Sequence, residues 1–370
     1  MFVDCIQFYQ CALQHTMNPQ NACHPRDDIL GPRQSAIFIA GEAEDVIVKT
    51  EGLRAVANMI HGAVSNNAFS VANWKQHPLN PKQATEQAVE WIFVVDLLNF
   101  SFWSTDYQVE YGGKIYHGYW SLCASVNRAL EENIPMIEAS FYSTVSKEQL
   151  KMIFRSNNGS EIPLFDQRLE ILHQAGAILK EKYAGKFVNC IRACKSDALG
   201  LLSLLVNEFP SFRDEAVYKS KKVSFYKRAQ ILVADLWACF EGQSLGEFYN
   251  IDDITIFADY RVPQVLVYLG AIEYSPKLMA RLQEDQLLEN DSREVCEIRG
   301  VTIYACEVLH TVLFDPSNFL HLVRDILQKD FDSSVNSILV DFFLWDYRRD
   351  NAEEIESKGI PFHRVRCIYY

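Results

Sequence analysis

The sequence lacks the cysteine and histidine patterns of metal-binding and disulfide-rich proteins. Its 370 residues include ten cysteines, but none forms a C-x-x-C pair and no histidine-rich segment lies at zinc-ligand spacing. We therefore expect no metal, no disulfide framework and no cofactor. The scattered cysteines are typical of reduced, mostly buried thiols in a cytoplasmic protein.

Long apolar segments are also lacking. Residues Met1–Asn21 mix polar and apolar side chains and have no basic start, so they do not resemble a signal peptide. The longest apolar candidate, Val89–Phe102, is interrupted by acidic and polar residues and falls short of the roughly 18–20 residues that span a bilayer. The sequence thus predicts a protein that is neither secreted nor membrane-spanning.

Positive charge is scarce as well, since the formal net charge is −13. Phosphate contacts dominate nucleic-acid affinity, and an acidic protein repels a polyanion unless it carries a strong basic patch. The densest basic stretches, Lys219–Lys222 and Arg348-Arg349, are short. Duplex DNA or RNA is therefore a poor candidate ligand, whereas a single phosphate group is compatible with these stretches.

What the chain does contain is enough apolar material for a large core, with 49% hydrophobic and 12% aromatic residues. Prolines and polar residues predict an irregular N-terminal arm over residues 1–41. Beyond it we expect one catalytic domain, 42–370, that is mainly α-helical with a minor β-hairpin around Gly112-Gly113. Helical spacing predicts the following helices: Gly52–Ser65, Thr85–Leu98, Leu122–Asn133, Ser146–Phe154, Phe165–Tyr183, Phe187–Phe209, Phe225–Gly242, Pro263–Gly270, Ser275–Leu288, Val301–Leu313, Asn318–Lys329 and Val335–Tyr347.

The first candidate for chemistry is Asp259, within Phe257–Gln264. It follows an apolar run and precedes Pro263, which favours the first turn of a helix. Position alone favours a plain helix cap. A partly desolvated catalytic acid or base is the alternative.

The order of elements around Asp259 favours the catalytic alternative. A turn, a buried helix, a loop and an Asp at a helix junction are similar to the helix-hairpin-helix DNA glycosylases. That resemblance implies that the Asp stabilises an oxocarbenium-like sugar and activates water, and it places Lys227 near the start of the buried helix. However, Val223–Tyr226 contains no glycine. The glycine-rich hairpin that grips DNA phosphates in those enzymes is therefore absent.

A second candidate is Asp341, which lies deep in apolar sequence. If this segment is helical, Ser337 and Asp341 are i and i+4 on one face. A carboxylate in apolar surroundings needs a partner or a cationic ligand. The sequence therefore leaves two interpretations of Asp341, a buried ion pair and a ligand-binding residue.

Aromatic residues form the third candidate, at Asn99–Ser104 and Gly118–Ser121. Such density usually indicates core packing. The interleaved Asn and Ser residues also suit a flat heteroaromatic ligand that stacks between rings. His77, in a proline-punctuated loop, is a candidate hydrogen-bond donor to that ligand.

Several short sequence segments resemble those of the queuosine salvage protein family. They are Phe100–Trp103, Gly118–Ser121, Ser224–Leu232 (SFYKRAQIL), Phe257–Gln264 (FADYRVPQ), Glu297–Gly300 and Pro361–Tyr370 (PFHRVRCIYY). The resemblance spans roughly Glu42–Tyr370 and leaves the N-terminal arm uncovered. It implies a glycosylase-like fold and a queuosine 5′-phosphate N-glycosylase that releases queuine and ribose 5-phosphate.

The resemblance also implies roles for individual residues. Asp259 would stabilise the oxocarbenium ion and orient the attacking water, and Phe257 would pack on the substrate. Asp341 with Ser337 would bind the polar base edge or the cationic arm, where charge-assisted hydrogen bonds are strongest. His77 is a further base-pocket candidate. Lys227 or Arg261 would hold the 5′-phosphate.

Three other functions fit parts of the sequence. A nucleosidase for another purine-like nucleotide would share the Asp and differ in its base pocket. A non-catalytic binding protein for a modified base would bind queuine without turnover. A DNA glycosylase would show salt-sensitive duplex binding, which the net charge and the missing glycine hairpin oppose.

Overall fold

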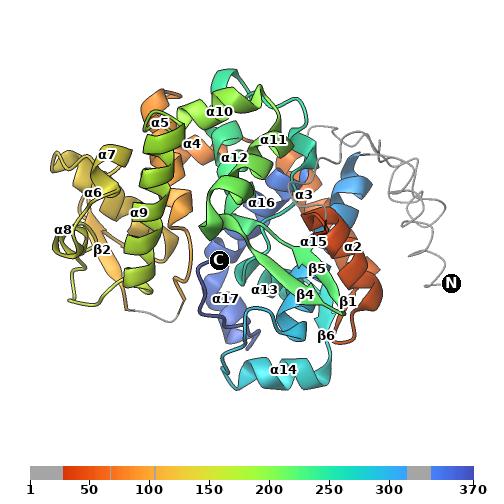
Figure 1. The fold of residues 1–370 in the computed structure, drawn as a ribbon. Helices are drawn as coiled ribbons and strands as arrows, with labels where there is room; N and C mark the ends of the chain where they lie inside the picture. The colour runs from red at the N-terminus through yellow and green to blue at the C-terminus, as the bar shows by residue number, and fades with distance from the viewer. Residues whose placement is uncertain (1–27, 67, 104–105, 315–334) are drawn as a thin grey trace. The chain divides into compact units, whose positions relative to one another are not determined.

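The computed structural model describes residues 28–66, 68–103, 106–314 and 335–370, and it is mainly helical (Figure 1). The chain groups into two compact units. The first comprises Met1–His61, Glu215–Phe225 and Ala258–His363, and the second comprises Gly62–Asp214, Tyr226–Phe257 and Arg364–Tyr370. The single domain over 42–370 stays a prediction. Within the described ranges, no helix is long and apolar enough to cross a membrane.

The first unit is organised around the long helix α15. Helices α2 and α16 pack against it, as do α13 and the strands β1 and β4. Strand β1 pairs antiparallel with β6, with Val46 opposite Tyr274. The elements of this unit are α2 (Pro32–Glu42), β1 (Val46–Val48), α3 (Thr50–Ser65, shared with the second unit), β4 (Glu215–Tyr218), β5 (Lys221–Ser224), α13 (Arg261–Tyr268), β6 (Ile272–Tyr274), α14 (Pro276–Gln283), α15 (Arg293–Phe314), α16 (Ser337–Asp350) and α17 (Ala352–Ser357).

Helix α2 corrects the end of the irregular arm expected over residues 1–41, because Pro32–Glu42 is a regular helix alongside α15. Residues 1–27 of that arm lie outside the described residues. Proline near a helix start is tolerated since its missing N–H would be unpaired there anyway. The close approach of the two helices requires Gly300, where a Cβ atom would lie 2.6 Å from Ile39. Gly300 ends Glu297–Gly300, one of the segments that carry the family resemblance. The close packing of α2 on α15 explains why a glycine is needed at this position.

In its described residues, the second unit is mainly helical and contains one hairpin. Its main contacts join α5 to α12, α7 to α9, and α6 to the hairpin. Its elements are α4 (Asn73–Gln76), α5 (Glu86–Leu97), β2 (Gln108–Tyr111), β3 (Lys114–His117), α6 (Tyr119–Glu131), α7 (Ala139–Tyr142), α8 (Lys147–Ile153), α9 (Phe165–Lys182), α10 (Val188–Cys194), α11 (Ala198–Glu208), α12 (Lys227–Cys239) and the short 3-10 turns η2 (Pro210–Phe212), η3 (Ser244–Gly246) and η4 (Ile251–Asp253).

The predicted turn and helix cap that depend on residues close together in the sequence are confirmed. The β2–β3 hairpin turns at Gly112-Gly113, where both glycines have positive φ. Helix α8 begins with the expected capping box between Ser146 and Gln149. In α5, the Thr85 side chain accepts a hydrogen bond from the Ala88 N–H.

Several helix predictions are wrong in their extent. The helix expected over Val301–Leu313 begins at Arg293, and the one expected over Ser275–Leu288 ends at Gln283. The segment Phe187–Phe209 forms two helices, because Lys195 and Ser196 adopt left-handed backbone angles and Asp197 caps a new helix. The helix expected over Phe225–Gly242 begins only at Lys227, after a second hairpin that pairs β4 with β5. The predicted helix Asn318–Lys329 lies outside the described residues.

Two buried guanidinium groups fix the C-terminal end of α5 in the second unit. Arg168 donates to the carbonyls of Leu98 and Phe100, and Arg228 donates to the carbonyls of Leu97 and Ser211. Both groups lie against the Phe100 ring, 4.1 Å and 5.0 Å from its centroid. Burial lowers the pKa of Arg168 to about 9 and that of Arg228 to about 10. The contacts with Leu97 and Leu98 satisfy carbonyls that the end of α5 leaves unpaired. The other two satisfy carbonyls of the following loop and of the turn at Pro210–Phe212.

We predict that Arg168→Met destabilises the protein by on the order of 2–5 kcal/mol, because it leaves buried carbonyls without donors. Urea unfolding measures the change. The control is Lys182→Met on the same helix, which removes only an exposed salt bridge to Glu208 and should cost less than about 1 kcal/mol. Equal losses for the two variants would contradict this account of Arg168.

Candidate active site

Asp259 lies just before helix α13 in the first unit. Its Oδ1 accepts hydrogen bonds from the backbone N–H groups of Arg261 at 2.6 Å and Val262 at 3.0 Å. The side chain is largely buried, with 9% of the residue exposed. Asp259 therefore caps the first N–H groups of α13, but from one residue before the N-cap, which is Tyr260. The helix begins at Arg261, and Pro263 is its third residue rather than its first.

The backbone before Asp259 is held by Arg299, a residue that is not among the predicted site residues. Arg299 projects from α15, is fully buried and donates from Nε to the Ala258 carbonyl at 2.9 Å. Its guanidinium lies 4.2 Å from the Phe225 ring centroid. Burial, with a contribution from nearby Arg299, lowers the pKa of His363 to about 3. Arg299 thus fixes the residue that precedes the candidate catalytic carboxylate.

The second candidate carboxylate, Asp341, lies in the first turns of α16 and is 5% exposed. One turn before it, Ser337 donates from Oγ to Glu307 Oε1 at 2.8 Å. The other oxygen of Glu307 accepts from Arg33 Nε at 2.5 Å. Asp341 and Glu307 both raise the pKa of buried Cys306, after burial itself. Ser337 and Glu307 thus form a buried hydrogen-bonded pair, and Asp341 is buried one turn further along the same helix. Glu307 was not among the predicted site residues.

Arg261, a predicted phosphate ligand, starts α13 directly after the Asp259 cap. Its guanidinium lies 5.1 Å from the Tyr260 ring centroid and 4.5 Å from that of Phe362. Helix α13 packs against α16. In the first unit, Arg261 lies on α13 directly after Asp259 and Tyr260, and Ser337 and Asp341 lie on the adjacent helix α16.

The remaining predicted residues lie in the second unit. Lys227 is 6% exposed, and its backbone N–H donates to Asp214 at 3.1 Å. Burial raises the pKa of nearby Asp96 to about 7, against the lowering effects of Lys227 and Asn99. Phe257 is buried, with 2% exposed. The phosphate-binding role of Lys227 and the substrate contact of Phe257 stay predictions.

His77 meets the aromatic residues with which the sequence analysis grouped it. Its ring stacks on Trp120, with centroids 3.3 Å apart and an interplanar angle of 14°. Tyr119 lies 4.8 Å from Trp120 and 6.5 Å from Phe102, also between ring centroids. The structure thus brings the loop histidine and the aromatic segments together, while the ligand that they would bind stays a prediction.

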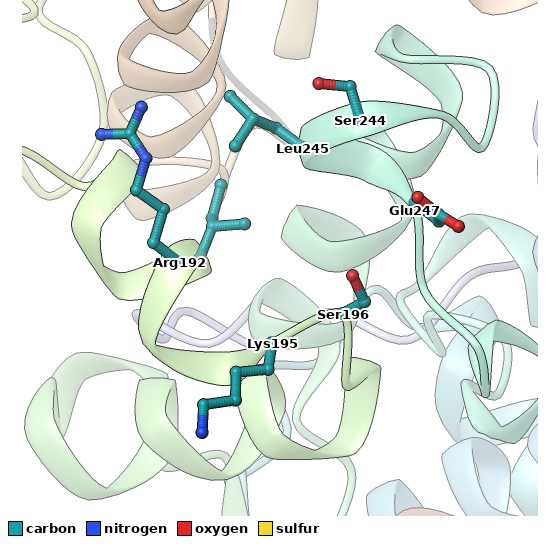
Figure 2. A pocket seen from close by; sticks show the side chains of 7 residues that line it. Arg192, Lys195, Ser196, Ser244, Leu245 and Glu247 are labelled. Carbon is teal, nitrogen blue, oxygen red and sulfur yellow. The ribbon is translucent and has the colours of Figure 1, made fainter.

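A pocket elsewhere in the second unit involves none of these residues. It encloses about 230 Å³ and is lined by Arg192, Lys195, Ser196, Ser244, Leu245 and Glu247 together with Ile191 (Figure 2). This volume is below the roughly 300–1,000 Å³ of typical small-molecule sites. We assign it no function.

Fold and site together define a mainly helical protein whose candidate active site is built from carboxylate and guanidinium side chains. The pattern of the family described as "Queuosine salvage protein" matches residues 79–370. The chain belongs to the queuosine salvage protein family.

Relatives in distant organisms cover nearly the whole chain. A Mus musculus protein is 47% identical over 348 residues, which cover 92% of this chain and 99% of the relative. A Bos taurus protein is 46% identical over 93% of this chain and 100% of its own length. A Sphaerobacter thermophilus protein is 35% identical over 93% of this chain and 98% of its own length. Each is named queuosine 5′-phosphate N-glycosylase/hydrolase.

The buried His363 predicts an acid-sensitive fold. Its folded pKa of about 3 lies below the unfolded value of about 6.5. Below pH 6.5 the unfolded chain therefore binds a proton that the folded chain does not, and stability falls as the pH drops toward 3. We expect the free energy of unfolding to fall about 1.4 kcal/mol per pH unit less steeply in His363→Asn between pH 6 and 4. Parallel curves would contradict this, and His117→Asn, an exposed histidine, is the control.

Proposed function

We propose that this protein hydrolyses the N-glycosidic bond of queuosine 5′-phosphate and releases queuine and ribose 5-phosphate. The observation that carries the proposal is the match in length and sequence to relatives named for this activity, from Mus musculus to Sphaerobacter thermophilus. A small-molecule nucleotide is then the substrate, with no role for duplex nucleic acid. A cytoplasmic location, as expected from the cysteine pattern, is part of the proposal.

The chemistry of the base determines what the site must supply. Queuine is a 7-deazaguanine, so the base has no N7 that could be protonated to improve the leaving group. Catalysis must rely on stabilising positive charge at the ribose and on holding the departing base. A carboxylate next to the anomeric carbon provides the first of these.

Asp259 suits that role because hydrogen bonds fix both its carboxylate and the backbone that precedes it. Two backbone N–H groups hold Oδ1, and Arg299 holds the preceding carbonyl. We assign the second carboxylate oxygen to the oxocarbenium ion and to the attacking water. Capping and catalysis therefore use different oxygens of one side chain.

Asp341 is assigned to the polar base edge or to the cationic arm of the base. A carboxylate in this buried position forms charge-assisted hydrogen bonds that are stronger than neutral ones. Ser337, whose hydroxyl already donates to Glu307, acts by positioning the start of α16. His77 and Phe257 are proposed base or substrate contacts, and the likeness to helix-hairpin-helix DNA glycosylases belongs to the same proposal.

Replacing Asp259 tests the catalytic assignment. Asp259→Asn keeps an oxygen that can accept both backbone hydrogen bonds, so the fold should persist. We expect queuine release from queuosine 5′-phosphate, followed by chromatography, to fall by at least about 100-fold. Near-normal release by a variant with an unchanged unfolding midpoint would overturn the assignment. Wild-type protein that binds queuine tightly without any turnover would instead indicate a binding protein.

Asp341→Asn distinguishes the two carboxylates. If Asp341 holds the base in both the ground and transition states, the variant should raise KM by roughly 10-fold and change kcat much less. A loss of kcat as large as that of Asp259→Asn, with unchanged KM, would exchange the two roles. Release from other purine nucleotides, measured in the same assay, tests the base specificity.

A further inference from the structure

Two side chains close the end of the short helix α4 in the second unit, where His77 is the C-cap residue. Lys82 donates from Nζ to the carbonyl of Lys75 at 2.7 Å and to that of His77. Asn80 donates from Nδ2 to the Trp74 carbonyl at 2.8 Å and from its backbone N–H to the His77 carbonyl at 3.1 Å. The end of a helix leaves such carbonyls without partners inside the helix. Lys82 and Asn80 therefore fix the backbone that carries His77.

A second set of hydrogen bonds ties the same loop to α6, the helix that carries Trp120. Asn127 on α6 donates from Nδ2 to the Leu79 carbonyl at 2.9 Å. Its Oδ1 accepts from Trp91 Nε1 at 2.7 Å, so the two ends of this amide have different partners. Leu79 itself is buried, with 2% exposed. The loop and the Trp120 ring are therefore both held on α6.

The loop also determines which ring nitrogen of His77 carries the proton. The backbone N–H of Leu79 donates to His77 Nδ1 at 3.3 Å. A nitrogen that accepts a hydrogen bond is unprotonated, so the neutral imidazole has its proton on Nε2. A proton on Nδ1 would instead set two donors against each other. In this loop His77 is therefore a donor through Nε2, with its ring stacked on Trp120.

The ammonium group of Lys82 interacts with backbone rather than with a carboxylate. In the ranges that the structure describes, no Asp or Glu lies within ion-pair distance of it. Lys82 is an exposed residue, yet burial lowers the pKa of its ammonium group. Lys75, in the same loop, pairs with Glu241 at 2.7 Å instead. Lys82 thus gives up part of its hydration for two carbonyls, and what it stabilises is the conformation of the loop.

We propose that Lys82 is a positioning residue, which holds His77 against Trp120 as the Nε2–H tautomer so that it donates to an acceptor atom on the edge of the base. This inference rests on the proposed function, in which His77 contacts the base. It adds Lys82, Asn80 and Asn127, to which the sequence analysis gave no role. A single fixed tautomer favours a base that presents a carbonyl oxygen or an unprotonated nitrogen at that edge. The competing explanation is that Lys82 only stabilises the end of α4.

The test is a double-mutant cycle of Lys82→Met and His77→Phe, with queuine release from queuosine 5′-phosphate as the measurement. Methionine keeps an unbranched side chain without the charge, and phenylalanine keeps a flat ring without nitrogen atoms. Lys82→Met should raise KM by about 3- to 10-fold, the effect of one neutral hydrogen bond, and change kcat by less than about twofold. In the His77→Phe background the same substitution should change KM by less than about twofold. An equal rise in both backgrounds would mean that Lys82 does not act through His77 and would overturn the proposal.

Lys75→Met is the matched control. It makes the same charge change in the same loop, but it breaks only the surface ion pair with Glu241 and leaves the Lys75 carbonyl in place. We expect KM to stay within about twofold of the wild type, because surface ion pairs contribute little. A rise as large as that of Lys82→Met would attribute the effect to the loss of charge alone, and the proposal would be wrong.

The tautomer of His77 gives a measurement that does not depend on turnover. In the full chain labelled with 15N-histidine, the NMR signals of His77 are those that disappear in His77→Phe. At pH 8, Nδ1 of the wild type should resonate as an unprotonated nitrogen and Nε2 as a protonated one, and Lys82→Met should shift both toward the average of exchanging tautomers. A wild-type proton on Nδ1, or an unchanged spectrum in Lys82→Met, would overturn the proposal. Wild-type protein that shows the expected spectra but releases no queuine would refute the proposed function and confirm the positioning of His77 by Lys82.

Discussion

The candidate site depends on one buried hydrogen bond, from the Arg299 guanidinium to the Ala258 carbonyl. A buried charge is stable only with partners that replace water, and one partner of Arg299 is the backbone just before Asp259. The same helix carries Glu297, which accepts from the N–H groups of Glu44 and Asp45, and Glu307, which accepts from Ser337. Helix α15 therefore orients the start of α13 and the start of α16 together.

In the second unit, two buried arginines likewise have backbone carbonyls as hydrogen-bond partners. Arg168 and Arg228 donate to the last carbonyls of α5, with the Phe100 ring against both. Both pKa values fall on burial, yet an arginine stays charged at neutral pH because its ordinary pKa is so high. Arginine is thus suited to cap buried helix ends where lysine would lose its proton more readily.

Features that depend on residues close together in the sequence could be predicted, and features that depend on residues far apart could not. The Asp259 cap and the capping box at Ser146 involve residues two or three apart, and both could be predicted. Arg299 lies 41 residues from Ala258, and Gln264 lies 84 from Arg348, so no local pattern could connect them. The β4–β5 hairpin was missed because strand formation depends on pairing and packing more than on propensity. Buried Arg and Glu in the apolar stretches of α15 were the available signal for Arg299 and Glu307.

The Gln264 amide joins two like charges in the first unit without adding a charge of its own. Its oxygen accepts from Arg261 and Arg348, which offsets part of the repulsion between the two guanidinium groups. Arg348 is also bonded to the exposed Glu356, and solvent screens that ion pair. A carboxylate in place of Gln264 would attract both arginines more strongly, but its burial would cost the free energy of removing another charge from water. A neutral amide therefore suits this buried position.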